Sequence, residues 1–186
     1  MKSTIQDKAK LVNSVFSKVY NKYDLMNDVM SLGIHRFWKD KLIDWMSPSI
    51  NSSLIDVASG TGDIAKLFSL RTNNSSTVTC IEPNDGMFKK GKDNLINFKN
   101  IKWIKSKAET LPIKDNMYDY YSISYGIRNV SDINKTLKEA YRVLKPGGRF
   151  MCLEFSKIDN EILNFLYKNY SKAIPTLGKY LSLIHI

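Results

Sequence analysis

The sequence has few of the residues from which metal centres, disulfide frameworks and hydrolytic triads are built. Its 186 residues include two cysteines and two histidines. Cys80 and Cys152 both lie in apolar, strand-like stretches, where free cysteine is usually a reduced core residue. No His, Cys and carboxylate cluster suggests a metal site, and no Ser-His-Asp set suggests hydrolysis. We therefore expect no metal and no disulfide.

Long hydrophobic runs are missing as well. Nowhere do about 18 apolar residues follow one another, as a membrane span requires, and the first ten residues, MKSTIQDKAK, lack the apolar centre of a secretory signal. These absences predict a cytoplasmic protein. No Pro/Gly/Ser-rich linker and no repeat divides the sequence, so we expect a single domain over residues 1–186.

Arginine is scarce although the chain is basic. The formal net charge is +10, yet only five of the 28 basic residues are arginine, and the lysines are scattered without the interleaved aromatic residues of a nucleic-acid platform. A [DN]PP[YF]-like site for an extruded base is also absent. We therefore expect no nucleic-acid partner. The alternative to a merely solvated basic surface is contact with an anionic membrane.

Hydrophobic periodicity predicts the order of the elements. Apolar residues recur at helical spacing from Lys10 to about Met30 and again in RFWKDKLIDWM, so the chain opens with helices. Strands are then expected at residues 54–58, 77–82, 100–105, 118–126 and 149–155, with helices from 63, over 85–95 and over 132–144. LKPGGR is expected to stop the last helix and turn the chain.

This alternation of strands and helices predicts an α/β fold, with a mostly parallel open sheet covered by helices on both faces. Ligands of such sheets bind outside the carboxyl ends of the strands, beside the first strand. The loops that follow the strands are therefore the candidate functional segments.

The stretch DVASGTGD places a glycine turn between the first of these strands and its helix. Gly60 and Gly62 allow the backbone to approach a ligand closely. A phosphate-binding loop would need Lys-Ser or Lys-Thr after the glycines, and neither is present. A dinucleotide turn, G-x-G-x-x-G/A, is matched loosely with Ala65 in third place. The turn alone therefore suits either a nicotinamide dinucleotide or S-adenosylmethionine.

Two carboxylates favour S-adenosylmethionine. Asp56, just before the turn, would repel a pyrophosphate but could pair with the methionine ammonium, directly or through water. The alternative for Asp56 is a carboxylate that caps a helix or braces the loop. Glu82 closes the second strand and could accept hydrogen bonds from two ribose hydroxyls, although a carboxylate there also serves a nicotinamide dinucleotide. Ala108 follows the third strand, where an adenine could lie against the backbone.

Five stretches carry a family resemblance: YDLMNDVMSLGIHRFWKD, DVASGTGD, AETLPIKDNMYD, SISYGIRNV and YRVLKPGGRFMCLEFS. Together they resemble the ubiquinone/menaquinone biosynthesis C-methyltransferase family, class I enzymes that depend on S-adenosylmethionine. The resemblance runs from about Val15 to Gly178. It implies a Rossmann-like class I methyltransferase fold with N-terminal lid helices in residues 1–50, a cofactor-binding core in 51–156 and a C-terminal helix and tail in 157–186.

The end of the chain departs from the family pattern. Family members continue past IPTLGK with helices and two further strands, whereas this sequence ends YLSLIHI. We therefore expect a C-terminally truncated chain that lacks the last two strands of the family sheet, which leaves the edge of the sheet exposed.

Carried over from the family, the cofactor contacts fall on Thr61, Glu82, Lys107, Ala108 and Ser124. Lys107 departs from the family, which usually has Asn or Asp at this position. Those side chains accept a hydrogen bond from the adenine amino group, and an ammonium cannot accept one. The resemblance thus predicts either a backbone contact to adenine or weaker binding.

The resemblance also implies the reaction, methylation of a ring carbon on a polyprenylated quinol, either 2-polyprenyl-6-methoxy-1,4-benzoquinol or demethylmenaquinol. In GIRNV, we predict that Arg128 stabilises the developing phenolate and orients a water that removes the proton, and that Asn129 holds a quinol oxygen. The alternative for Arg128 is a structural ion pair. We further expect peripheral contact with the inner membrane, and quinone-biosynthesis proteins or a second copy as partners.

Two other functions stay open at this point. One is a class I methyltransferase that acts on another small molecule. The other is a non-catalytic cofactor-binding or interaction protein, which the expected truncation makes plausible.

Overall fold

The structure is a computed structural model, and it describes Asp28, Ser31 and residues 33–156. In these residues five parallel strands form one sheet in the order β3-β2-β1-β4-β5. The strands are β1 (Ser53–Val57), β2 (Thr77–Ile81), β3 (Ile101–Ile104), β4 (Tyr118–Ser124) and β5 (Leu144–Leu153). The helices are α3 (Ile34–Met46), α4 (Asp63–Arg71), α5 (Asp85–Asn94), the 3-10 helix η2 (Ile127–Asn129) and α6 (Ile133–Val143).

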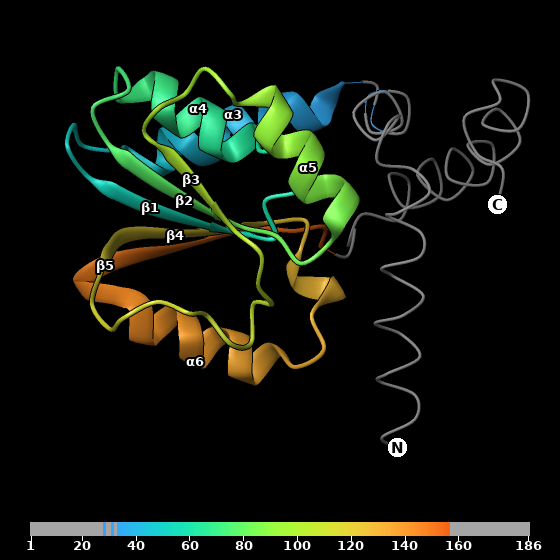
Figure 1. The fold of residues 1–186 in the computed structure, drawn as a ribbon, viewed down its shortest axis with the longest axis vertical. Helices are drawn as coiled ribbons and strands as arrows, with labels where there is room; N and C mark the ends of the chain where they lie inside the picture. Colours follow the sequence, from blue (N-terminus) through green and yellow to red (C-terminus); the bar gives the residue numbers. More distant parts are fainter. Residues whose placement is uncertain (1–27, 29–30, 32, 157–186) are drawn as a thin grey trace, which may run out of the picture.

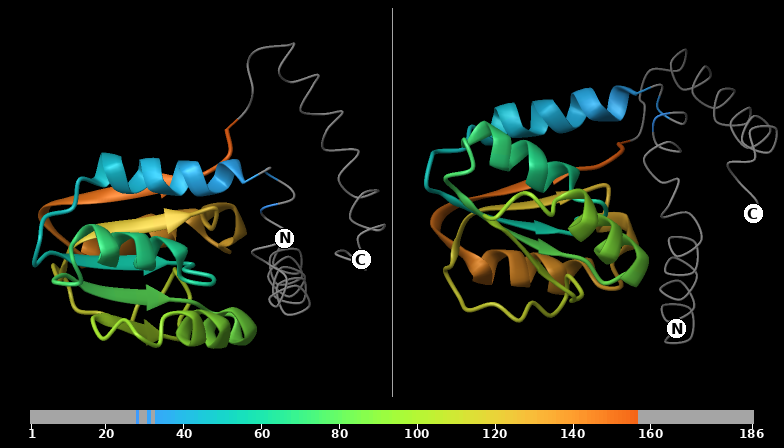
Figure 2. Two further views of the ribbon diagram at one scale, coloured as in Figure 1. Left: turned by 90° about the horizontal axis from the view of Figure 1, so that it is seen from above. Right: turned by 45° about the horizontal axis from the view of Figure 1, so that its top comes forward.

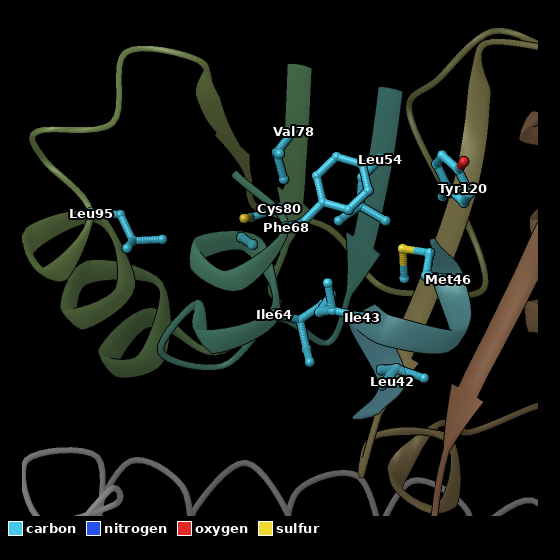
Figure 3. Packing of buried hydrophobic residues seen from close by; sticks show 11 residues of the cluster. Leu42, Ile43, Met46, Leu54, Ile64, Phe68, Val78, Cys80, Leu95 and Tyr120 are labelled. Carbon is cyan, nitrogen blue, oxygen red and sulfur yellow. The ribbon is translucent and has the colours of Figure 1, made fainter. Parts of the chain in front are cut away.

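The helices cover both faces of the sheet, as the alternation predicts. Helices α3, α4 and α5 lie on one side of the sheet and α6 lies on the other (Figures 1 and 2). Side chains alternate along a strand, so neighbouring residues of β1 pack into the hydrophobic clusters on opposite faces of the sheet. Leu54 packs with α3 and α4 (Figure 3), and Ile55 packs with α6. The predicted α/β class and sheet are thereby confirmed.

Local signals account for several helix boundaries. The side chain of Asn84 accepts a hydrogen bond from the backbone N–H of Met87 at the start of α5, and Asp132 does the same for Lys135 at the start of α6. Helix α4 instead begins directly after Gly62, whose positive φ of 90° redirects the chain. The predicted start of this helix at Asp63 is confirmed.

The junction between α6 and β5 differs from the prediction. Helix α6 ends at Val143 before LKPGGR, as expected, but β5 begins at Leu144 rather than at residue 149. Leu144 pairs with Tyr118 and Arg149 with Tyr120, so the residues between them form an irregularity inside the strand. The sequence signal for a turn therefore marks a bulge in β5, the last strand of the sheet among the described residues.

Helix α3 packs closely onto the sheet and onto α4. Its residues Leu42, Ile43 and Met46 are buried in the core that α4 shares (Figure 3). Apart from α3, Asp28, Ser31 and residues 33 and 47–50, the proposed lid segment lies outside the described residues, as does the segment 157–186. The domain boundaries stay a prediction.

The two cysteines have different surroundings. Cys80 is buried in β2, whereas Cys152 in β5 is exposed, so the prediction of a core thiol is right for Cys80 and wrong for Cys152. Among the described strands, β5 pairs only with β4. Side chains of β5 such as that of Cys152 are therefore covered less completely than those of the central strands. In the described part of the chain no helix is long and apolar enough to cross a membrane, and no group of three or more His, Cys, Asp or Glu residues could hold a metal ion.

Candidate functional site

The loops after β1 and β4 meet at the carboxyl edge of the sheet. The chain order reverses between these two neighbouring strands, which is where open α/β sheets bind ligands. Ala58 and Tyr125, the residues that follow the two strand ends, have positive φ angles of 55° and 54°. A Cβ built on Gly126 would lie 2.6 Å from the Cβ of Ala58. The glycine turn and the GIRNV segment are therefore in direct contact.

The two glycines of the turn have different roles. Gly60 has a φ of 57°, and a Cβ added there would meet no atom of the described residues within 4 Å, so its Cα faces space that those residues leave open. A Cβ on Gly62 would lie 2.6 Å from Leu95 Cδ1 and 3.1 Å from Trp103 Cζ2. Gly60 thus leaves room for a ligand, and Gly62 lets the start of α4 pack against its neighbours.

Glu82 ties the turn to the next loop. Its Oε2 accepts a hydrogen bond of 2.9 Å from the backbone N–H of Gly60, and its Oε1 accepts one of 2.9 Å from the N–H of Asn84. The side chain is buried, and this burial raises the pKa of Glu82, while the two N–H donors oppose the rise. Each carboxylate oxygen has a further lone pair with which it can accept from a ligand hydroxyl.

Asp56 is the most deeply buried carboxylate of the site, with 1% of its surface exposed. Ser122 donates a hydrogen bond of 2.6 Å to Oδ1, while Oδ2 is buried and has no hydrogen-bond partner among the described residues. Burial raises the pKa of Asp56 to about 7, although the hydrogen bond from Ser122 opposes the rise. A buried acceptor without a partner is costly, so Oδ2 is a natural place for a ligand donor.

A buried lysine of α3 contacts the residue that follows the glycine turn. The sequence interpretation missed this lysine. Lys39 is 8% exposed, and its Nζ lies 2.6 Å from Oδ2 of Asp63, the first residue of α4. The available signal was its position, because Lys39 shares the helical stripe of Leu42, Ile43 and Met46. A lysine on an apolar stripe indicates a buried ammonium that needs acceptors.

The GIRNV segment forms η2 and contacts the end of β5. The Nη1 atom of Arg128 lies 3.0 Å from Oε1 of Glu154, and its guanidinium lies over the ring of Phe155, 5.0 Å from the centroid. The side-chain amide of Asn129 donates to the carbonyl of Tyr125 at 3.4 Å. The ion pair that was the alternative interpretation for Arg128 is therefore present. The catalytic role of Arg128 stays a prediction.

The remaining predicted contacts lie at the same edge in different surroundings. Lys107 is exposed, whereas Ala108 is buried in the core on the α6 side of the sheet. Thr61 is also buried. Ser124 ends β4, and its Oγ is buried with no hydrogen-bond partner among the residues that the structure describes. Ser124 thus offers a second polar atom that a ligand could satisfy.

A comparison with family models matches residues 2–183 to the "ubiE/COQ5 methyltransferase family". The chain belongs to the ubiE/COQ5 methyltransferase family. It is 51% identical over 183 residues to the protein named ubiquinone/menaquinone biosynthesis C-methyltransferase UbiE of Rickettsia bellii, an alignment that covers 95% of this chain and 73% of the relative. The protein of the same name from Rickettsia prowazekii is 52% identical over 180 residues, covering 92% of this chain and 72% of the relative.

Solved structures support the fold of this family member. A protein from Methanococcus maripaludis superposes with a TM-score of 0.67 at 17% identity, covering 88% of this chain and 74% of that one. A SAM-dependent methyltransferase from Aquifex aeolicus gives 0.59 at 18% identity, covering 71% and 78%. The predicted Rossmann-like class I methyltransferase fold is thereby confirmed.

The residues at this edge fit the methyl donor of the family. S-adenosylmethionine presents an ammonium, a carboxylate, a ribose diol and an adenine. The buried free oxygen of Asp56 suits the ammonium, the carboxylate of Glu82 suits the diol, and the open side of Gly60 admits a close backbone approach. Chemistry and burial therefore agree for two groups of the donor, and the turn leaves space beside them.

Proposed function

We propose that this protein is an S-adenosylmethionine-dependent C-methyltransferase that methylates a polyprenylated quinol, either 2-polyprenyl-6-methoxy-1,4-benzoquinol or demethylmenaquinol. Its family membership and the names of its relatives support the reaction. The observation that carries the proposal is the contact of Gly126 with Ala58, which joins the candidate donor turn to the candidate acceptor segment. A transferase needs its two substrates side by side.

In this proposal the donor is held by residues at the carboxyl ends of four strands and in the loops that follow them. Asp56 accepts from the ammonium and Glu82 from the ribose hydroxyls, while Gly60 and Thr61 line the turn. Lys107 and Ala108 border the adenine through their backbone, and the Oγ of Ser124 adds a polar contact. When bound, the donor supplies an electrophilic methyl group on a sulfonium.

Arg128 and Asn129 act on the acceptor. A phenolate is a far better carbon nucleophile than a phenol, and a nearby guanidinium lowers the pKa of the quinol hydroxyl by stabilising the anion. Arg128 also orients the water that takes the proton. Glu154 fixes one side of the guanidinium through Nη1, and the ring of Phe155 lies against the guanidinium. Asn129 holds a quinol oxygen beside the guanidinium.

The substrate also suggests where the protein works. A polyprenyl tail partitions into lipid, so the reaction brings the protein to the periphery of the inner membrane from the cytoplasm. The net charge of +10 favours contact with an anionic surface. Quinone-biosynthesis proteins and a second copy of the chain remain the proposed protein partners.

Methyl transfer to defined quinols tests the proposal. The full chain is incubated with labelled S-adenosylmethionine and vesicles that contain either the demethylated benzoquinol or demethylmenaquinol, reduced beforehand. We expect label on the ring carbon of at least one quinol and none on the oxidised quinones, because only the quinol yields a phenolate. Donor binding without transfer to either quinol would refute the substrate class, and absence of donor binding would refute the methyltransferase function.

A further inference from the structure

Lys39 is a buried cation whose hydrogen-bonding capacity is only partly used. Among the described residues it is the only lysine or arginine that is buried. An ammonium carries three donors, yet its one hydrogen-bond acceptor in the described part of the chain is Oδ2 of Asp63. Burying an ammonium without a full set of acceptors is costly. The site therefore has capacity for another anionic group.

The surroundings of Lys39 place that capacity beside the glycine turn. Asp63 directly follows Gly62 and begins α4, so its contact with Lys39 brings the ammonium to the turn. Asp56 shares the face of β1 with Leu54, which α3 and α4 cover, and the charge of Lys39 acts on its ionisation. The buried cation of α3 and the buried carboxylate of β1 thus lie on the same side of the sheet.

The amino-acid end of the proposed donor has the complementary pair of charges. Its ammonium and carboxylate are joined through one carbon, so a site that takes one must also accommodate the other. A carboxylate brought near Asp56 without a cation would be repelled and poorly solvated. Asp63 satisfies one donor of Lys39 and is itself 43% exposed at its side chain, so the pair lies between the buried core and the open side of the turn.

We propose that Lys39 binds the carboxylate of S-adenosylmethionine, and that the Lys39 and Asp63 pair holds the ammonium in position for it. This inference rests on the proposed function, since it assumes that the donor occupies the turn. It assigns α3 a binding role in addition to its packing role. Charge-assisted hydrogen bonds are stronger than neutral ones, and we expect a 10- to 100-fold change in affinity, or about 1.4–2.7 kcal/mol at 1.36 kcal/mol per factor of ten.

Calorimetry with two ligands separates binding from packing. S-adenosylhomocysteine carries the carboxylate, and S-adenosyl-3-thiopropylamine lacks only that group. We expect the full wild-type chain to prefer the first ligand by 10- to 100-fold, and Lys39→Met to abolish this preference while changing affinity for the second less than threefold. Lys41→Met is the matched control, because Lys41 lies on the same helix, is half exposed and pairs with Asp44.

Each other outcome has a definite meaning. Equal losses for both ligands in Lys39→Met, or a preference that survives the substitution, would overturn the inference and leave the proposed function intact. A wild-type chain that binds neither ligand would overturn both. Lys39→Gln provides a second uncharged variant that still donates to Asp63, and it should lose the preference as well if Lys39→Met fails to fold. Lys39→Arg should restore part of the preference.

Discussion

Replacing Asp56 by Asn should make the protein more stable at alkaline pH and less able to bind its donor. The carboxylate is 1% exposed and has one oxygen without a partner among the described residues, so its ionisation in the folded protein is unfavourable. Asn has nearly the same shape, can still accept from Ser122 and carries no charge. The substitution therefore removes the cost of a buried charge and also removes the group proposed to bind the ammonium.

The magnitude follows from the pKa of Asp56, which burial raises from an ordinary value of 3.8 to about 7. In the unfolded chain the carboxyl ionises near pH 4, whereas in the folded protein it keeps its proton to near neutrality. The folded state then binds more protons between these values, so the stability of the wild type falls as pH rises through this window. The full pKa shift corresponds to about 4 kcal/mol of unfolding free energy. The wild type loses about 3 kcal/mol of this between pH 4.5 and 8.

Urea unfolding of both proteins at several pH values measures this effect. The unfolding free energy of Asp56→Asn minus that of the wild type should rise by about 3 kcal/mol from pH 4.5 to 8. The amide NH₂ that Asp56→Asn introduces lacks an acceptor at every pH, so its constant cost of about 1–3 kcal/mol cancels in this comparison. A difference that stays flat with pH would refute the reasoning, whatever its sign.

Three further predictions concern the same edge of the sheet. Gly62→Ala should lower the unfolding free energy in urea by about 2–4 kcal/mol, because the φ of Gly62 is 90° and the new Cβ would crowd Leu95. Gly60→Ala should lower it by only about 1 kcal/mol but weaken donor binding. Equal losses of stability would contradict these roles. Arg128→Ala should lower kcat for quinol methylation about 10²- to 10³-fold with donor affinity unchanged, and an unchanged kcat/KM would remove Arg128 from the mechanism. Donor binding near pH 6.5 should release protons, because the bound ammonium lowers the pKa of Asp56, and calorimetry in buffers of different ionisation enthalpy should detect this release; heats independent of buffer would argue against Asp56 as the ammonium ligand.

The sequence predicts the described fold well because its signals are local. The alternation of short apolar strands with helices, and the glycine turn before Asp63, depend on neighbouring residues and determine the βαβ order. The strand start at Leu144 was missed because Pro146 and the following glycines signal a turn, whereas pairing with β4 makes them a bulge. The exposure of Cys152 was missed because an apolar strand pattern does not reveal that, among the described strands, β5 has a neighbour on one side alone.

The site was predicted less completely, because it depends on contacts between distant residues. Asp56 and Glu82 could be selected by their places beside the turn, but the bond of Glu82 to Gly60 spans 22 positions. The pairing of Lys39 with Asp63 spans 24 positions and joins two helices. Periodicity places Lys39 on a buried stripe without showing which group it meets, so only the tertiary structure reveals the pair.

The contact between Ala58 and Gly126 also restricts the order in which these positions can change during evolution. A side chain at position 126 would collide with the methyl group of Ala58, so any substitution of Gly126 is harmful while alanine stands at 58. Ala58→Gly would remove that methyl group and relax the positive φ of 55° at the same time. Only after this change could alanine become tolerable at position 126. The contact therefore predicts that substitutions at the two positions are coupled, with Ala58→Gly reducing the cost of Gly126→Ala.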